Sequence, residues 1–183
     1  RLSQGMSDKA KAHDLPHGGG KMVVILPKEF NRRAVMLQIG KWVEQLNGAY
    51  ITASDSGTNS TDMDLIAEAT EFVACPKRWA DYNPSYYTAL GVYNAIKAAL
   101  GNLNECSILV QGVGEVGMHL LAMLNQNNVN LTISDINSEK AKAASKNFKA
   151  KIVDPKSCLF SECDLLIPCA LGGILNPLSL PKI

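Results

Sequence analysis

The sequence predicts an α/β fold whose second half is a doubly wound parallel sheet. From about residue 85 onward, apolar strands alternate with helices in units of about 30 residues, as in parallel strands joined by crossover helices. Within this region, the glycine-rich turn from Gly112 to Gly117 comes directly after one such strand and before a helix. The first half adds further strand and helix patterns, so we expect a separate α/β region there.

In the first half, the expected elements are strands over 21–26 and 50–52, and helices over 27–46 and 61–70. Both strands are short apolar runs of the kind that is buried in a sheet. Pro27 opens the first helix, and Asn47-Gly48 closes it, because these residue types tolerate the left-handed backbone of a C-terminal cap. Thr61 and Asp64 have the spacing of a capping box, which would open the second helix.

In the second half, the expected helices are 87–100, 117–125 and 138–148, and the expected strands are 107–111, 130–134, 152–153 and 165–167. Ser138 is the expected N-cap of the last helix. The loop 76–84 separates the two patterns, and we therefore expect one domain over 1–84 and another over 85–183. The chain begins with Arg1 rather than methionine, so we interpret both domains as partial.

The composition is that of an ordinary folded protein and excludes several classes. The 183 residues are 46% hydrophobic and 19% charged, with a formal net charge of +1. Charges of both signs are mixed along the chain, which does not favour nucleic-acid binding. Apolar stretches are only a few residues long, so we expect no membrane span, no signal peptide and a cytoplasmic location. The spacing of the five cysteines favours reduced thiols, without disulfides or a metal site.

The glycine-rich turn has the sequence context of a dinucleotide-binding fingerprint. Gly112 permits the tight turn, Gly114 lets the backbone approach a pyrophosphate, and Gly117 lets helix and strand pack closely. Asp135, at the end of the next strand, would accept hydrogen bonds from ribose hydroxyls and repel a 2′-phosphate, which favours NAD over NADP. The predicted NAD contacts here are Gly112, Val113, Gly114, Glu115, Val116, Gly117, Asp135 and Ile136. The alternative is a strand-to-helix turn that binds no ligand.

A second glycine run, Gly18 to Gly20, precedes Lys21. From the residues alone, a flexible turn before a strand explains this motif as well as a functional site does. It is not a phosphate-binding Walker motif, because neither Ser nor Thr follows the lysine and the glycine spacing differs.

Several further blocks of sequence accompany the glycine-lysine motif in a fixed order. The blocks are Arg1–Lys9, Leu15–Lys21, 50–58, 62–64, 83–85, 88–93, 110–114, 134–137 and 168–173. Together they resemble the amino acid dehydrogenases of the glutamate, leucine, phenylalanine and valine family, with the leucine-type members nearest. The resemblance covers essentially the whole chain. It implies a two-domain dehydrogenase, with an α/β substrate domain followed by a Rossmann-type NAD domain, present here as a fragment.

The resemblance also implies roles for individual residues. Lys9 corresponds to the lysine that holds the substrate carboxylate, Lys21 to the catalytic lysine, and Asp55 to the carboxylate that exchanges protons with the amino group. Ala53 corresponds to a small residue at the substrate side-chain pocket, and Thr88 to a threonine near the nicotinamide. The family's loop along the nicotinamide ribose corresponds to Cys169, Ala170, Leu171 and Gly172.

The implied reaction is NAD-dependent oxidative deamination of an L-amino acid, leucine or another branched-chain aliphatic, to the 2-oxo acid and ammonia, and its reverse. The implied partners are these small molecules and further copies of the chain in a homo-oligomer. Two alternatives stay open. One is a relative that acts on glutamate, phenylalanine, valine or tryptophan, and the other is a non-catalytic NAD-binding homologue. The presence of Lys9, Lys21 and Asp55 favours an enzyme.

Overall fold

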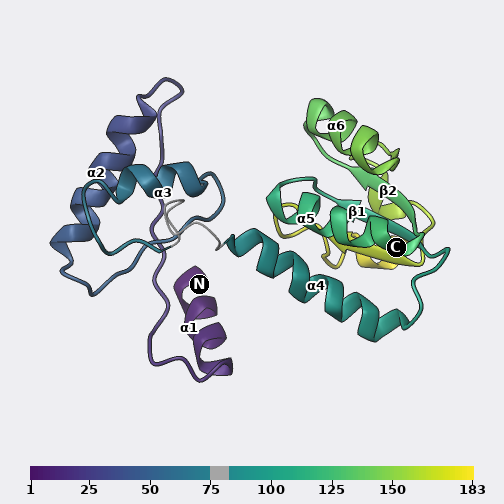
Figure 1. Cartoon of the computed structure of the whole chain (residues 1–183), viewed down its shortest axis with the longest axis horizontal. Coiled ribbons are helices and arrows are strands. Elements are labelled where there is room, and N and C mark those ends of the chain that lie inside the picture. Colours follow the sequence, from purple (N-terminus) through teal and green to yellow (C-terminus); the bar gives the residue numbers. More distant parts are fainter. Residues whose placement is uncertain (75–82) are drawn as a thin grey trace. The chain divides into compact units, whose positions relative to one another are not determined.

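The computed structural model describes residues 1–74 and 83–183. Contacts divide the chain into two compact units, Arg1–Tyr82 and Asn83–Ile183, and each is described by itself (Figure 1). The predicted boundary loop 76–84 lies outside the described residues except for its last two positions. Within the described part of the chain, no helix is both long and apolar enough to cross a membrane.

The first unit is built on two helices that pack together. Its helices are α1 (Leu2–Ala12), α2 (Arg32–Gln45) and α3 (Ser60–Ile66). Its buried core joins α2 to α3 and to the segment after α3, and consists of Met36, Ile39, Val43, Met63, Ile66 and Val73. The helix α1 was not predicted, although Leu2, Met6 and Ala10 recur at the four-residue spacing of one helical face.

The predicted strands of the first unit were wrong. Residues 21–26 are not in a strand, and Ile25 is 93% exposed rather than buried. Of residues 50–52, only Thr52 is paired, in an isolated parallel bridge to Val73. An apolar run becomes a strand only where a neighbouring backbone completes its hydrogen bonds, and no described segment lies beside residues 21–26 in that way.

The helix starts of this unit were also misplaced. Pro27 does not open α2, which begins at Arg32 after the N-cap Asn31, whose side chain accepts a hydrogen bond from the backbone of Ala34 at 3.0 Å. Proline offers no side-chain acceptor for such a bond, whereas asparagine does. The capping box of α3 is formed by Asn59 and Asp62, not by Thr61 and Asp64.

The second unit contains a parallel sheet in the order β3-β2-β1-β4. The strands are β1 (Ser107–Gln111), β2 (Asn130–Ser134), β3 (Lys151–Ile152) and β4 (Leu165–Pro168). The chain moves outward from β1 through β2 to β3 and then returns to the other side of β1. The carboxyl ends of β1 and β4 therefore lie side by side at the point where the winding direction reverses.

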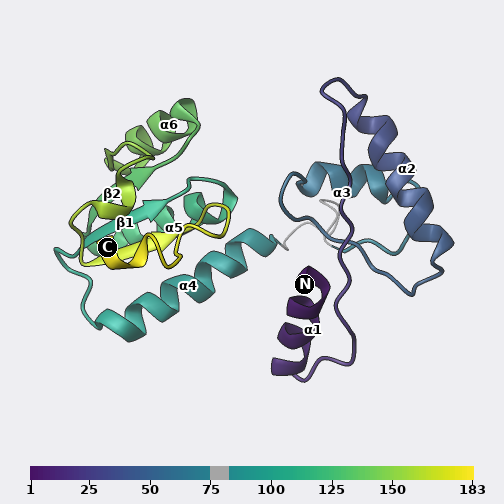
Figure 2. The same ribbon diagram turned by 180° about the vertical axis from the view of Figure 1, so that it is seen from behind.

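Helices α4 (Pro84–Leu100), α5 (Glu115–Leu124) and α6 (Ser138–Phe148) accompany this sheet, with short 3-10 turns at Asn125–Asn127, Cys158–Phe160 and Leu180–Lys182. In both views α4 runs alongside α5 (Figures 1 and 2). The N-cap of α6 is Asn137, not Ser138, because the Asn137 side chain accepts from Glu139 and Lys140. The apolar strands and helix faces form one core around β1, which includes Ile108, Val110, Leu120, Leu121, Leu124, Ile133 and Ala144.

Candidate active site

The glycines before Lys21 allow neighbouring groups to contact the backbone directly. A Cβ at Gly19 would overlap Ser3 and Ser7 of α1, and the Gly19 amide donates a hydrogen bond to the Ser7 hydroxyl at 2.8 Å. A Cβ at Gly20 would come within 2.5 Å of the Tyr50 ring. Gly19 and Gly20 are therefore packed against α1 and Tyr50, which hold the backbone from which Lys21 extends.

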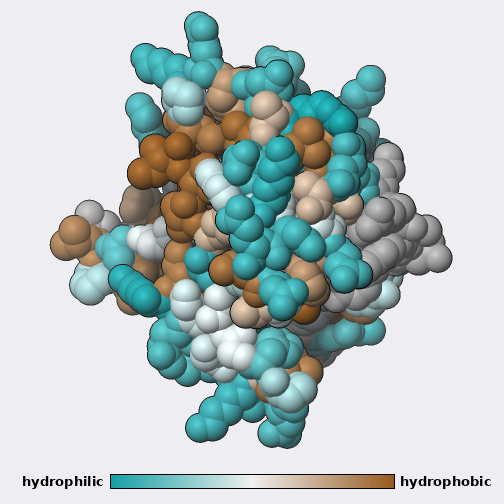
Figure 3. All heavy atoms as spheres, turned by 90° about the vertical axis from the view of Figure 1, so that its left-hand side faces the viewer, coloured by the Kyte–Doolittle hydropathy of each residue, from teal (hydrophilic) through white to brown (hydrophobic). Residues whose placement is uncertain are grey.

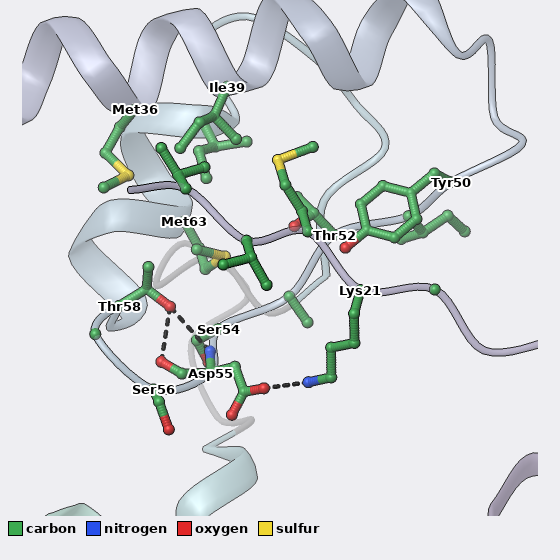
Figure 4. Close-up of a pocket in the computed structure, with 18 of the residues that line it drawn as sticks. Lys21, Met36, Ile39, Tyr50, Thr52, Ser54, Asp55, Ser56, Thr58 and Met63 are labelled. Carbon is green, nitrogen blue, oxygen red and sulfur yellow. Dashed lines mark hydrogen bonds and ion pairs between the residues drawn. The ribbon is translucent and has the colours of Figure 1, made fainter. Parts of the chain in front are cut away.

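Lys21 and Asp55 form an ion pair across the first unit (Figure 4). The Lys21 ammonium donates to a carboxylate oxygen of Asp55, although 34 residues separate them. This hydrogen bond holds the pKa of the Asp55 carboxyl below its usual range, and the Ser56 backbone acts in the same direction. The side chains are 25% and 61% exposed, so a bound molecule can reach both groups.

Asp55 begins a tight turn that Thr58 closes. The Thr58 amide donates to the Asp55 carbonyl at 2.9 Å. The Thr58 hydroxyl donates to the same carbonyl and accepts from the Asp55 amide, each at 2.9 Å (Figure 4). Gly57 has φ +87°, the left-handed conformation that a glycine adopts without strain. These bonds orient the backbone that carries the Asp55 carboxylate.

An ion pair between the exposed Arg32 and the buried Asp62 supports this region from the side of α3. Arg32 donates from Nε and Nη2 to the two oxygens of Asp62, at 2.7 and 2.6 Å. The Asp62 side chain is 3% exposed. The hydrogen bonds from Arg32 hold the pKa of Asp62 below its usual range, although burial acts in the opposite direction. Sequence analysis missed Arg32, because a partner 30 positions away leaves no local pattern.

Replacing Asp62 with Asn is expected to lower the free energy of unfolding by about 2 kcal/mol at pH 7, because hydrogen bonds to charged groups contribute that much. Since the folded pKa of Asp62 lies below the unfolded value, its contribution is fully present above about pH 4 and is lost as the pH falls through the folded pKa. Urea unfolding of both proteins at pH 7 and pH 3 should show a smaller difference at pH 3. A difference that does not depend on pH would contradict an ionic role.

Lys21 and Asp55 stand at the polar end of a cavity of about 680 Å³. Ala53 also lines this cavity, as do Ser54 and Ser56. Apolar side chains form the opposite wall, where Figure 4 shows Met36, Ile39 and Met63; the remaining apolar lining includes Met22, Val24, Val35 and Ile66. A charged pair beside an apolar wall suits a ligand with a polar head and an aliphatic chain.

The glycine-rich turn of the second unit has tight and open positions. Gly112 has φ +96°, and a Cβ there would come within 2.7 Å of the Ala170 amide nitrogen in the loop after β4. A Cβ at Gly117 would overlap the Gly112 carbonyl. At Gly114, by contrast, nothing lies within 4 Å of an added Cβ. Gly114 is the N-cap of α5 and supplies no side-chain cap, so the turn leaves room for an anion near that helix end.

Asp135 and Ile136 follow β2 beside this turn. The Asp135 carboxylate accepts hydrogen bonds from the amides of Val113 and Asn137, each at 2.8 Å. Each oxygen keeps capacity for a second hydrogen bond, because an ionised carboxylate offers about four acceptor positions. Ile136 is 94% exposed. Glu115 accepts from the Ser85 hydroxyl at 3.0 Å, and so links the turn to the start of α4.

Of the other predicted site residues, Lys9, Thr88, Ala170, Leu171 and Gly172 are exposed, whereas Cys169 is partly buried. Lys9 lies in the last turn of α1, the helix that packs on Gly19. The Thr88 hydroxyl donates to the Pro84 carbonyl within α4 at 2.9 Å. In the loop after β4, the Cys169 amide donates to the Gln111 carbonyl at 2.6 Å, and burial raises the pKa of the Cys169 thiol. Leu171 and Gly172 are exposed in that loop.

Comparison with known proteins gives matches along the whole chain. Residues 1–72 match a family model described as the Glu/Leu/Phe/Val dehydrogenase dimerisation domain. The leucine dehydrogenase of Geobacillus stearothermophilus is 41% identical over 192 residues, covering 100% of the chain and 52% of that enzyme. An L-tryptophan dehydrogenase of Nostoc punctiforme is 35% identical over 187 residues, covering 99% of the chain and 53% of that enzyme. The chain thus spans about half the length of the curated relatives that it matches.

Solved structures agree with these matches. The crystal structure of L-tryptophan dehydrogenase from Nostoc punctiforme has a TM-score of 0.69 at 34% identity, covering 100% of the chain and 53% of that structure. The hetero-hexameric glutamate dehydrogenase from Thermus thermophilus has a TM-score of 0.75 at 18% identity, covering 100% and 52%, and supports the fold alone. From these matches, the chain belongs to the Glu/Leu/Phe/Val dehydrogenase family, as a leucine dehydrogenase-like member.

Proposed function

We propose that the protein is an NAD-dependent L-amino acid dehydrogenase, which converts an L-amino acid to the 2-oxo acid and ammonia and catalyses the reverse reaction. The observation that carries this proposal is the ion pair of Lys21 and Asp55 at the polar end of an apolar cavity, in a member of this family. Oxidative deamination needs an acid-base pair beside the substrate α-carbon and an apolar region for its side chain. The ion pair of Lys21 and Asp55 and the apolar wall of the same cavity support these two requirements in the first unit.

Lys21 and Asp55 have complementary roles in this proposal. Loss of a hydride from the α-carbon leaves an iminium, which water must attack before ammonia can leave. Lys21, once its ammonium has released a proton, takes a proton from that water as the neutral amine, and Asp55 exchanges protons with the nitrogen. Lys9 holds the substrate α-carboxylate through its charge, and so fixes the α-carbon relative to Lys21. Ala53, small and in the same cavity, leaves space for the side chain.

The turn after β1 fits the pyrophosphate of NAD. The open position at Gly114 and the uncapped start of α5 supply space and backbone N–H groups, while Gly112 and Gly117 hold the turn close to its neighbours. Asp135 would accept from the adenosine ribose, and the exposed Ile136 would contact the adenine. When bound, NAD supplies the hydride acceptor. The proposed cofactor contacts are Gly112, Val113, Gly114, Glu115, Val116, Gly117, Asp135, Ile136, Cys169, Ala170, Leu171 and Gly172.

We assign residues 1–84 to a substrate domain and 85–183 to a Rossmann-type NAD domain. The sheet order β3-β2-β1-β4 supports the second assignment, because dinucleotides bind beyond the carboxyl ends of strands where the winding reverses. The loop that contains Ala170 follows β4 and packs on Gly112, at that same point. Thr88, in α4, is the proposed contact to the nicotinamide amide.

The proposed substrate is leucine or another branched-chain aliphatic amino acid. The apolar wall that contains Met36, Ile39 and Met63 supports an aliphatic side chain, as does the 41% identity to a leucine dehydrogenase. We also propose a cytoplasmic homo-oligomer. Apolar surface gathers on the face that Figure 3 shows. The exposed large apolar side chains of the first unit are those of Leu2, Met6, Leu15, Val23, Val24, Ile25, Phe30, Trp42, Leu46 and Ile51.

An activity screen of the full-length protein tests this function. With NAD and a panel of L-amino acids, we expect NADH formation to be fastest with leucine, isoleucine or valine and at least about tenfold slower with glutamate, because an apolar wall does not solvate a second carboxylate. Fastest turnover of phenylalanine, tryptophan or glutamate would move the protein to another branch of the family. Binding of NAD with no NADH from any amino acid would contradict the enzyme and favour a non-catalytic homologue.

A further inference from the structure

We propose that Arg32 is a positioning residue for Asp55, which it holds in place through the backbone of the turn that follows. This inference rests on the proposed function. Arg32 does not contact Asp55 itself. Its Nη2 donates to the Gly57 carbonyl at 2.8 Å, and the same guanidinium is fixed by the two oxygens of Asp62.

The chain of contacts begins in the core of the first unit. Asp62 belongs to α3, where it also accepts from the Asn59 amide at 2.8 Å and completes the capping box. Its immediate neighbour in α3, Met63, is fully buried in the core that joins α3 to α2. Arg32 is the first residue of α2. Its guanidinium is therefore anchored by both helices before it reaches the turn.

The turn transmits this anchorage to the carboxylate. Gly57 has a left-handed backbone and contributes no side chain. Its carbonyl is therefore the group through which Arg32 can hold the middle of the turn by a hydrogen bond. Thr58, the next residue, makes two side-chain hydrogen bonds to the Asp55 backbone. A shift of Gly57 would thus move Thr58 and with it the Asp55 carboxylate, away from Lys21. Misplacement of a reacting group by about 1 Å can cost a factor of about 100 in rate.

The geometry requires arginine and not only a positive charge. Nε and Nη2 bind the two oxygens of Asp62, while Nη2 also reaches Gly57. A lysine ammonium has one nitrogen, which can neutralise Asp62 but cannot reproduce this planar fork and the carbonyl bond together. A lysine at position 32 would still neutralise the charge of Asp62, but it would not hold the Gly57 carbonyl in the same place.

The chain offers a matched control one residue along. Arg33 makes the same kind of bidentate pair, from Nη1 and Nη2 to Glu68 at 3.0 and 2.6 Å. That pair is exposed and, among the described residues, forms no hydrogen bond to the Asp55 turn, so Arg33→Lys alters a bidentate pair of the same kind without changing the turn. The two variants separate positioning of Asp55 from a general effect on the packing of α2.

The test compares Arg32→Lys with Arg33→Lys in the full-length protein. For Arg32→Lys we expect kcat with the best amino acid to fall at least about tenfold, with an unchanged KM for NAD. We also expect the pKa of Asp55, measured by NMR of its carboxyl carbon, to rise toward the ordinary value because the bond to Lys21 weakens. Arg33→Lys should match the wild type in all three. Equal kcat in the two variants, or an unmoved Asp55 pKa in Arg32→Lys, would overturn the proposal.

Two further observations keep the result decisive. If Arg32→Lys is markedly less stable than Arg33→Lys, Thr58→Val decides, since it removes both side-chain hydrogen bonds to the Asp55 backbone and leaves the pair of Arg32 and Asp62 intact. It should give the same fall in kcat, and wild-type kcat would overturn the proposal. If the wild type forms no NADH with any amino acid, the proposed function fails, and the NMR titration of Asp55 still decides the role of Arg32.

Discussion

The Lys21→Ala variant is expected to lose about three orders of magnitude in kcat for amino acid oxidation while binding NAD as tightly as the wild type. The loss follows from the proposed role, because removal of a general base costs a factor of about 10² to 10⁴. Lys21 belongs to the first unit and the glycine-rich turn to the second, so NAD affinity should not change. Steady-state kinetics and fluorescence titration with NADH measure the two quantities separately.

A surface lysine provides the control for this variant. Lys41 is exposed on α2 and has no assigned role, so Lys41→Ala should retain wild-type kcat. The ion pair that Lys21→Ala removes is largely exposed, and pairs of this kind add little stability, so the melting temperature should stay nearly constant. Loss of NAD binding in Lys21→Ala would show that the lysine has been assigned to the wrong site.

Gly117→Ala and Gly114→Ala should both weaken NAD binding, but only the first should destabilise the fold. At Gly117 the new methyl group would overlap the Gly112 carbonyl, so the backbone must shift, at a cost of about 2 kcal/mol. At Gly114 the methyl group meets no protein atom within 4 Å, yet it would occupy the space proposed for the pyrophosphate. We expect at least a tenfold rise in the Kd for NAD in each variant.

Thermal unfolding and calorimetric titration with NAD test this pair together. Gly114→Ala should unfold at the wild-type temperature and bind weakly, whereas Gly117→Ala should unfold several degrees earlier. If Gly114→Ala binds NAD with wild-type affinity, the pyrophosphate does not lie at this turn. If Gly117→Ala is as stable as the wild type, the close contact with Gly112 is absent in solution.

The sequence predicted the second unit better than the first, for a physical reason. The alternation that predicts β1, α5, β2 and α6 belongs to elements that complete one another's hydrogen bonds and core between residues 107 and 148. The extended run 21–26 has the same apolar character as those strands, but the described structure provides no backbone partner for it. The apolar pattern of residues 21–26 therefore did not by itself identify a strand.

Helix ends and distant pairs were the other limits. Three helices are capped by an asparagine side-chain oxygen, from Asn31, Asn59 and Asn137. From the sequence, these helix starts were predicted instead at Pro27, Thr61 and Ser138. The glycine-lysine motif was recognisable only with its family context, because its packing on α1 and Tyr50 depends on residues far away in the sequence. The hydrogen bond from Arg32 to Gly57 also joins residues far apart in the sequence, and no local sequence pattern predicts it.

The two hydrogen bonds of Asp135 have a consequence for protein engineering. The Asp135 carboxylate, which we propose distinguishes the ribose of NAD from the 2′-phosphorylated ribose of NADP, also accepts hydrogen bonds from the amides of Val113 and Asn137. Replacing Asp135 with a residue that can bind a ribose 2′-phosphate would also remove the hydrogen bond that holds the Val113 amide in the glycine-rich turn. Redesign of cofactor preference in this protein therefore has to begin with a new acceptor for the Val113 amide, and only afterwards with the phosphate.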